Sequence, residues 1–387
     1  MRAIGLMSGT SLDGIDAALI DIAPRGDGYA LDLVRFAAVP FAGDLRARLL
    51  AALPPHHATA ADGAMLDRAL GDAFAAAART VAAGERVDYV ASHGLTLVHR
   101  GEASTTMQIG DPYRIRDAMG ATVVFDFRRA DCARGGHGAP LVPYVDALLF
   151  ASHERDTVAL NLGGIANVTV LEAGAHASAA TAWDTGPGNM LIDAFVARRT
   201  DGNERYDAGG ARAARGTIDD RALHEMIARE AFYLIQPPPK STGRERFGEA
   251  LLDAHAELFD DMPLDDACAT LAAFTVATIG DALDRYGPAR ARLVVSGGGA
   301  HNATIVAGLA ARLPTYDVML ASALGIDVDA KEALAFALLG YETLRGRPAN
   351  LPRATGASAA TVLGAIAPHE LAELLAQIAD DVAANEP

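Results

Sequence analysis

One carboxylate in the sequence lies where it could do acid–base chemistry. Asp184 follows the apolar Trp183 in the motif AWDTGPGNMLIDAF, and a Thr-Gly-Pro-Gly turn separates it from a helix expected to start near Asn189. A carboxylate held at such a turn can serve as a general base. An isolated Asp more often only caps its turn, so this motif alone leaves both roles open.

Three glycine-containing turns could bind phosphate: SGTSLDG (8–14), NLGGIAN (161–167) and VVSGGGAHN (294–302). Glycine permits backbone conformations and close approaches that a side chain forbids. Successive amides can then bind a phosphate, and the hydroxyls of Ser8, Thr10 and Ser11 add donors in the first turn. The third turn lies between a strand and a helix, which suits a nucleotide at a helix N-terminus. Each turn could equally be a plain connection, the first of them capped by Asp13.

Two common nucleotide-binding motifs are excluded. None of the three turns carries the lysine that a Walker loop requires. A Rossmann fingerprint opens a helix, whereas the first turn leads into the strand-like run DAALIDIA. His93 and His99 fit structural or solvated roles better than catalytic ones, and no His, Cys and Glu grouping has the spacing of a zinc site.

The elements around these turns repeat. AIGLMSGTSLDGIDAALID and TVALNLGGIANVTVLEA both read as an apolar strand, a glycine turn and a second strand. Helices are expected at 189–199, 219–230, 247–259 and 266–286, and the polar run at 126–140 is expected to be a long loop or an interdomain crossing. Two similarly ordered halves predict a two-domain α/β protein with a cleft between the domains.

Bulk composition narrows the function classes. The chain has 387 residues, 33 basic and 49 acidic side chains and a formal net charge of −16, so it has no general attraction to nucleic acid or to anionic lipid. The longest apolar run, 267–280, is too short to span a bilayer and predicts a buried core helix. With no credible secretion signal and two distant cysteines, we expect a soluble cytoplasmic protein.

Taken together, the motifs resemble the anhydro-N-acetylmuramic acid kinase family, of the sugar-kinase, Hsp70 and actin superfamily. They run in order from residue 5 to about residue 357: GLMSGTSLDGID, QIGDP, FDFRRAD, GGHGAPLVP, NLGGIANVT, WDTGPGNMLID, PPKSTGRERFG, SGGGAHN, KEALAFALL and NLPRATGA. The resemblance implies an α/β, two-domain actin-like (ribonuclease H-like) ATPase fold with an interdomain active-site cleft. It also implies a homodimer.

The implied reaction opens the 1,6-anhydro ring of 1,6-anhydro-N-acetylmuramic acid with water and transfers the γ-phosphoryl of ATP to O6, with Mg²⁺ as the metal. Asp184 matches the family's catalytic aspartate, taken to activate the water. The ATP-binding residues we expect are Gly9, Thr10, Ser11, Leu12, Asp13, Gly14, Ile15, Asp16, Gly163, Gly164, Gly297, Gly298, Gly299 and Asn302. The candidates for sugar binding are His93, Thr96, Asp126, Asn167 and Glu332, with Arg128, Lys240 and Arg244 as candidates for the lactyl carboxylate.

The family usually has Gln where this chain has Leu95, which predicts the loss of a polar contact near the sugar. Domain I is expected at 1–130, with the C-terminal helix at about 358–387 able to return to it, and domain II at 131–357. A sugar kinase acting on an ordinary hexose hydroxyl remains an alternative, as does a nucleotide switch of the actin or Hsp70 type.

Overall fold

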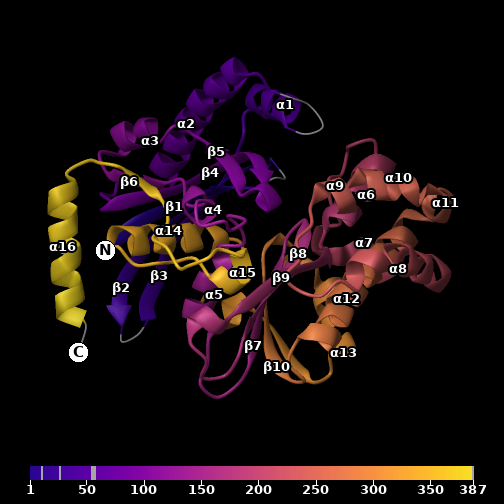
Figure 1. Cartoon of the computed structure of the whole chain (residues 1–387). Helices are drawn as coiled ribbons and strands as arrows, with labels where there is room; N and C mark the ends of the chain where they lie inside the picture. The colour runs from indigo at the N-terminus through magenta and orange to yellow at the C-terminus, as the bar shows by residue number, and fades with distance from the viewer. Residues whose placement is uncertain (10–11, 26–27, 54–57, 386–387) are drawn as a thin grey trace. The chain divides into compact units, whose positions relative to one another are not determined.

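The computed structural model describes residues 1–9, 12–25, 28–53 and 58–385 (Figure 1). The chain divides into two compact units: unit 1 comprises Met1–Leu149 and Ala330–Pro387, and unit 2 comprises Phe150–Asp329. The units therefore change at 149/150 and at 329/330, rather than near the predicted residues 130 and 358.

Unit 1 is built on a seven-stranded sheet with the order β12-β6-β4-β1-β2-β3, and β5 pairs with β4. Strands β1 and β4 are parallel, as are β4 and β6, whereas the β1–β2 and β2–β3 pairs are antiparallel. Its elements are β1 (Arg2–Ser8), β2 (Gly14–Arg25), β3 (Gly28–Pro40), α1 (Gly43–Ala52), α2 (Ala60–Ala82), β4 (Tyr89–Arg100), η1 (Gly101–Ala103), β5 (Thr105–Ile109), α3 (Pro112–Met119), β6 (Thr122–Phe125), α4 (Arg129–Cys132), α5 (Val142–Phe150), α14 (Lys331–Leu344), α15 (Pro352–Thr355), β12 (Ala365–Ala367) and α16 (Leu371–Asn385).

Unit 2 is built on a five-stranded sheet with the order β11-β10-β7-β8-β9. Its elements are β7 (Thr157–Leu162), β8 (Ile165–Leu171), η2 (Ala177–Ala179), β9 (Thr181–Pro187), α6 (Met190–Arg199), η3 (Ala208–Gly210), α7 (Ala211–Arg215), α8 (Asp220–Leu234), α9 (Arg244–Phe247), α10 (Glu249–Ala254), α11 (Ala256–Phe259), α12 (Leu264–Tyr286), β10 (Ala291–Ser296), η4 (Gly298–His301), α13 (Ala303–Arg312), β11 (Tyr316–Leu320) and η5 (Ala321–Leu324).

The two sheets share one topology. In each unit an antiparallel three-strand meander (β1–β2–β3 or β7–β8–β9) is extended on its first strand by two parallel strands (β4 and β6, or β10 and β11). The repeat seen in the sequence is therefore a repeat of structure. This confirms the predicted two-domain α/β fold of the actin-like, ribonuclease H-like kind.

The polar run at 126–140 stays in unit 1 because a buried carboxylate ties it there. Asp131, which is fully buried, accepts hydrogen bonds from Gly138 N (2.8 Å), Asn350 Nδ2 (2.6 Å) and Thr355 Oγ1 (2.7 Å). A buried carboxylate must be matched by donors in this way. The run thus packs against the 350–358 segment and contains the short helix α4, so it is not the interdomain crossing.

Helix α14 belongs to unit 1 because it packs directly on β1. A Cβ at Gly5 would lie 1.8 Å from the carbonyl oxygen of Ala333, so only glycine allows this approach of helix to strand. The sequence offers no local signal for that contact, so it does not predict that residues 331–344 belong to unit 1.

Most predicted helices are confirmed, with one exception. The helix expected at 247–259 is three short ones, α9, α10 and α11, interrupted at Gly248 and His255. Helix α12 is long and apolar enough to cross a membrane, but 72% of its most apolar window is buried in the protein. It packs against α6, α7, α8, α13 and β9 as the predicted core helix.

Candidate active site

The turn at 8–16 joins β1 to β2 in unit 1. Ser8 Oγ donates to the carbonyl oxygen of Gly14 (2.8 Å), and Leu12 N donates to that of Gly9 (3.3 Å). Leu12 has φ +58°, a left-handed conformation that is unfavourable for leucine and is found preferentially at functional turns. Thr10 and Ser11 lie outside the described residues.

Three of the predicted ATP-binding residues in this turn also have a role in the packing of unit 1. The side chains of Leu12 and Ile15 are each 1% exposed and lie in the hydrophobic core of unit 1, so only their backbone could meet a ligand. A Cβ at Gly14 would lie 2.3 Å from the carbonyl oxygen of Val39, so this glycine serves the pairing of β2 with β3. Asp13 is exposed, and Asp16 lies on β2 opposite Met7.

The glycine turns of unit 2 assemble into one structure. Asn189 N donates to the carbonyl oxygen of Gly163 (2.9 Å), and Gly188 N and Met190 N donate to that of Gly164 (2.8 and 3.2 Å). The β7–β8 turn is thereby fastened to the start of α6, directly after the Thr-Gly-Pro-Gly turn. The two motifs NLGGIAN and WDTGPGN, although separate in sequence, form one edge of the sheet.

The third turn, 297–299, packs against the same edge. A Cβ at Gly299 would lie 2.4 Å from Leu162 Cγ and 2.7 Å from Asn189 Nδ2, and Gly297 has φ +83°. By contrast, a Cβ at Gly298 would meet nothing within 4 Å. Asn302 caps α13 by accepting from Ile305 N (3.1 Å), so its side-chain oxygen holds the helix start.

A row of polar side chains crosses the unit 2 sheet at this end. Ser296 on β10 pairs in register with Asn161 on β7, Asn161 with Asn167 on β8, and Asn167 with Asp184 on β9. Residues that pair across a ladder point to the same face of the sheet. The row therefore places the predicted base beside the amide of Asn167. Asn161 and Ser296, which the sequence does not single out as site residues, continue the row on the next two strands.

Asp184 is held by the segment that carries the KSTG motif. Its backbone N donates to the carbonyl oxygen of Lys240 (3.1 Å), and Thr242 N donates to its carboxylate Oδ2 (2.8 Å). Tyr233 OH donates to its carbonyl oxygen (2.9 Å). The carboxylate is half-buried and oriented by a backbone amide, as a general base requires.

Of the predicted sugar-binding residues of unit 1, His93 contacts Arg128. The Nε of Arg128 donates to His93 Nε2 (2.9 Å) and its Nη1 to the carbonyl oxygen of Gly138 (2.8 Å). Burial, with a further contribution from Arg128, holds the pKa of His93 well below its usual value, so His93 is neutral and accepts at Nε2. Burial also lowers the pKa of Arg128 to about 10, although the charge of Glu332 acts to raise it.

Other predicted residues have local partners. Thr96 Oγ1 accepts from Gln108 Nε2 (3.1 Å), and Asp126 pairs with Arg129. Leu95 is fully buried in the core of unit 1, so the residue that replaces the family's Gln packs against apolar neighbours. Arg244 is exposed at the start of α9.

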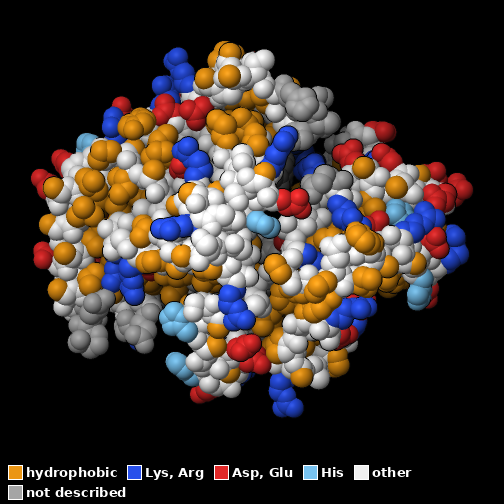
Figure 2. Space-filling view, in the orientation of Figure 1, with side chains coloured by type: hydrophobic (Ala, Val, Ile, Leu, Met, Phe, Trp, Pro, Cys, Tyr) orange, Lys and Arg blue, Asp and Glu red, His pale blue; other side chains and the backbone are white. Residues whose placement is uncertain are grey.

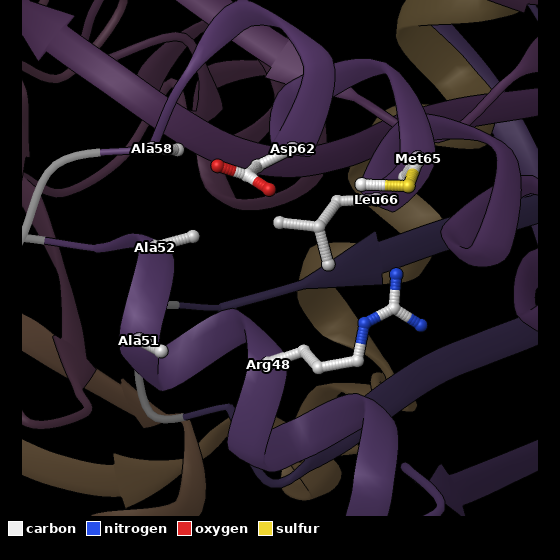
Figure 3. A pocket seen from close by; sticks show the side chains of 7 residues that line it. All are labelled: Arg48, Ala51, Ala52, Ala58, Asp62, Met65 and Leu66. Atoms are coloured by element: carbon white, nitrogen blue, oxygen red, sulfur yellow. The ribbon is translucent and has the colours of Figure 1, made fainter.

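A small pocket lies elsewhere in unit 1, between α1 and α2 (Figure 3). None of the predicted site residues lines it, and the carboxylate of Asp62 at its rim is engaged in the capping box of α2 with Thr59. Among the described residues no three His, Cys, Asp or Glu side chains form a metal-binding group.

The family of the chain follows from its similarity to known proteins. A family model described as anhydro-N-acetylmuramic acid kinase matches residues 1–369. The chain belongs to the anhydro-N-acetylmuramic acid kinase family. It is 42% identical over 378 residues to the anhydro-N-acetylmuramic acid kinase of Rhodococcus erythropolis, covering 95% of this chain and 94% of that one. The Streptomyces coelicolor relative is 43% identical over 374 residues, with the same coverage.

Likeness to solved structures is lower. An activator of 2-hydroxyisocaproyl-CoA dehydratase from Clostridium difficile, solved with bound ADPNP, is 11% identical, with a TM-score of 0.44 over 88% of this chain and 94% of that chain. The two chains differ too much for one to inform on the other. Membership of the family is therefore shown by sequence similarity, which extends over both units.

Proposed function

We propose that the chain is an ATP-dependent kinase that opens the 1,6-anhydro ring of 1,6-anhydro-N-acetylmuramic acid and phosphorylates O6. The products are N-acetylmuramic acid 6-phosphate and ADP, formed during cytoplasmic recycling of cell-wall fragments. Family membership and the names of the relatives support this reaction. The structural observation that supports this reaction most directly concerns Asp184. Its carboxylate accepts from Thr242 N and lies beside Asn167 in the row of polar side chains.

The chemistry needs a single base near the anomeric carbon. Water adds to C1 as the C1–O6 bond breaks, O6 attacks the γ-phosphorus, and ADP leaves. Asp184 takes the proton of the water at the carboxylate oxygen that does not accept from Thr242 N. Mg²⁺, when bound with ATP, offsets the negative charge of the phosphates. The sugar is proposed to be held by Asn167 and Asn161 in unit 2 and by Thr96, Asp126, Glu332 and the His93–Arg128 pair in unit 1.

Backbone amides are proposed to bind the ATP phosphates. In unit 1 these belong to the 9–16 turn, with the carboxylates of Asp13 and Asp16 beside them. In unit 2 they belong to the turns at 163–164 and 297–299, where the open space over Gly298 admits a ligand atom at the backbone. The homodimer implied by the resemblance stays a prediction.

The reaction is tested by comparing substrates. We expect phosphate transfer from ATP to 1,6-anhydro-N-acetylmuramic acid, and little to N-acetylmuramic acid or glucose. Product mass distinguishes ring opening with phosphorylation from plain phosphorylation. Transfer to glucose at a comparable rate would favour an ordinary hexose kinase, and ATP hydrolysis indifferent to all three sugars would favour a nucleotide switch.

Gly9→Val is expected to raise the Kd for ATP at least about tenfold, ~1.4 kcal/mol, because a β-branched side chain obstructs both the turn and a bound phosphate. Calorimetric titration of ATP into the folded variant measures this. Gly43→Val is the matched control in the same unit, since a Cβ at Gly43 would meet nothing within 4 Å. Unchanged ATP affinity in folded Gly9→Val would defeat the assignment of this turn.

Gly298→Ala and Gly299→Ala separate ligand binding from packing. The first adds a methyl group in open space, so we expect an unchanged melting temperature and an ATP Kd raised about tenfold. The second forces a methyl group against Leu162, whose backbone must shift, so the melting temperature should fall. If Gly298→Ala binds ATP as well as the natural protein does, the 297–299 turn does not contact the phosphates.

A further inference from the structure

Lys240 occupies an unusual position for a basic side chain. Its Nζ donates to the carbonyl oxygens of Tyr233 and Leu234 (3.1 Å each) at the C-terminal end of α8. Carbonyls in the last turn of a helix can accept from groups outside the helix, and that of Tyr233 also accepts from Gln236 N (3.1 Å). A cation at this end also interacts favourably with the helix dipole. The ammonium therefore fastens the 240–242 backbone to the end of α8.

Tyr233 is the second part of this connection. Lys240 Nζ lies 4.5 Å from the centre of its ring, and the guanidinium carbon of Arg246 lies 5.1 Å from the same centre. Cations at these distances from a tyrosine ring are attracted to it. The hydroxyl of Tyr233 donates to the carbonyl oxygen of Asp184, so one side chain joins Lys240 to the strand that carries the predicted base.

The third part is the backbone of the segment itself. Lys240 accepts from Asp184 N, and two residues later Thr242 N donates to Asp184 Oδ2. The position of Thr242 N depends on where the 240–242 backbone lies, and that backbone is fixed at one end by the Lys240 side chain. A displacement of about 1 Å at such a donor can cost ~10²-fold in rate.

The choice of lysine is informative. Lys240 and Lys331 are the only two lysines in the sequence, against 31 arginines. A compact ammonium can donate to two neighbouring carbonyls, whereas a planar guanidinium is suited to carboxylates and phosphates. The geometry at this position therefore suits lysine, in a chain whose basic residues are nearly all arginine.

We propose that Lys240 is a positioning residue for the base: its ammonium holds the 240–242 backbone against α8 and so sets the hydrogen bond from Thr242 N to the Asp184 carboxylate. This inference rests on the proposed function of Asp184 as the base. It gives Lys240 a role through the orientation of another side chain, in place of the contact with the lactyl carboxylate that the sequence suggested.

The turnover of the enzyme should depend on whether Lys240 is charged. Burial and the charge of Arg285 on α12 lower the pKa of Lys240 to about 8, while the charge of Asp184 on β9 acts to raise it. Arg246 on α9 is the other cation that lies against the Tyr233 ring. Above that pH the side chain loses its charge and one donor, and its hold on the α8 carbonyls weakens. Turnover at saturating ATP should therefore fall as the pH rises through about 8.

The first experiment replaces the ammonium and then restores it. Lys240→Met should lower kcat between about 10- and 100-fold, leave the KM for ATP unchanged and abolish the alkaline fall in turnover. Lys240→Cys treated with 2-bromoethylamine forms a thioether that carries an ammonium, and activity should return. Cys132 and Cys268 are buried and should not react in the folded enzyme. Arg229→Met is the matched control, because Arg229 lies on α8 with exposed carboxylate partners. Figure 2 shows Lys, Arg, Asp and Glu side chains gathered over the part of unit 2 where Figure 1 labels α8, α10 and α11.

The second experiment separates this proposal from the proposed function. In an Asp184→Asn background, Lys240→Met should cost nothing further, since the group it positions is already absent. The same loss in both backgrounds, or full activity in Lys240→Met, overturns the positioning role whatever Asp184 does. Lysine labelled with ¹³C at Cε gives only two NMR signals, and the one lost in Lys240→Arg should titrate near pH 8. Near-normal turnover of Asp184→Asn alone would instead overturn the base.

Discussion

Asp184→Asn is expected to lower turnover of the anhydro sugar by ~10² or more at saturating ATP, while ATP affinity stays largely intact. Asparagine is nearly isosteric and can still accept from Thr242 N, which now donates to Asp184 Oδ2, so the local structure is kept. It cannot take a proton from water. Steady-state turnover of the folded variant, with calorimetric ATP binding alongside, measures both quantities.

The alternative role of Asp184 as a turn cap gives a different result. Asparagine caps nearly as well as aspartate, so a purely structural role would leave turnover close to normal. Asp253→Asn is a suitable control, because Asp253 is exposed on unit 2 and pairs only across the surface with Arg198. Near-normal turnover of Asp184→Asn would contradict the assignment of Asp184 as the general base.

Lys331→Met is expected to destabilise unit 1 by about 3–5 kcal/mol, because it leaves the Asp146 carboxylate buried without its main countercharge. Lys331 Nζ lies 2.9 Å from Asp146 Oδ1, and the two side chains are 1% and 5% exposed. Urea unfolding followed by a probe in unit 1 measures the loss. The pair joins the first residue of α14 to α5, so its removal should also disturb the neighbouring Glu332.

Two comparisons locate the cause of that destabilisation. The double variant Lys331→Met/Asp146→Leu removes both charges and should recover much of the stability, since apolar replacement of a buried pair is often neutral. Arg86→Met removes a surface partner of Glu370 and should change little. Equal destabilisation in the single and the double variant would mean that lost packing, rather than the unpaired charge, is responsible.

Local patterns in the sequence predicted a large part of this protein. Strand β1, the glycine turn and strand β2 follow from an apolar run broken by Gly and Asp, and the core helix α12 follows from the long apolar run at 267–280. The ordered motifs sufficed for the family, and WDTGPGN singled out Asp184. All of these signals lie within stretches of a few residues, where local sterics and periodicity decide the outcome.

Contacts between residues far apart in the sequence decided which side chains complete the core and which unit each helix joins. Leu12 and Ile15 sit in a phosphate-binding motif, yet their side chains complete the core of unit 1. Helix α14 joins unit 1 because Gly5, more than 300 positions earlier in the sequence, lets it approach β1. No periodicity within either segment encodes such a pairing.

The site shows the same division. The sequence by itself determined the family, the repeated strand–turn–strand units and the identity of the predicted base. Only the tertiary structure placed Ser296, Asn161, Asn167 and Asp184 in one row, because strand register joins residues that are far apart in the chain. It likewise set Lys240 against the end of α8, since the carbonyls that accept from its ammonium belong to a different element.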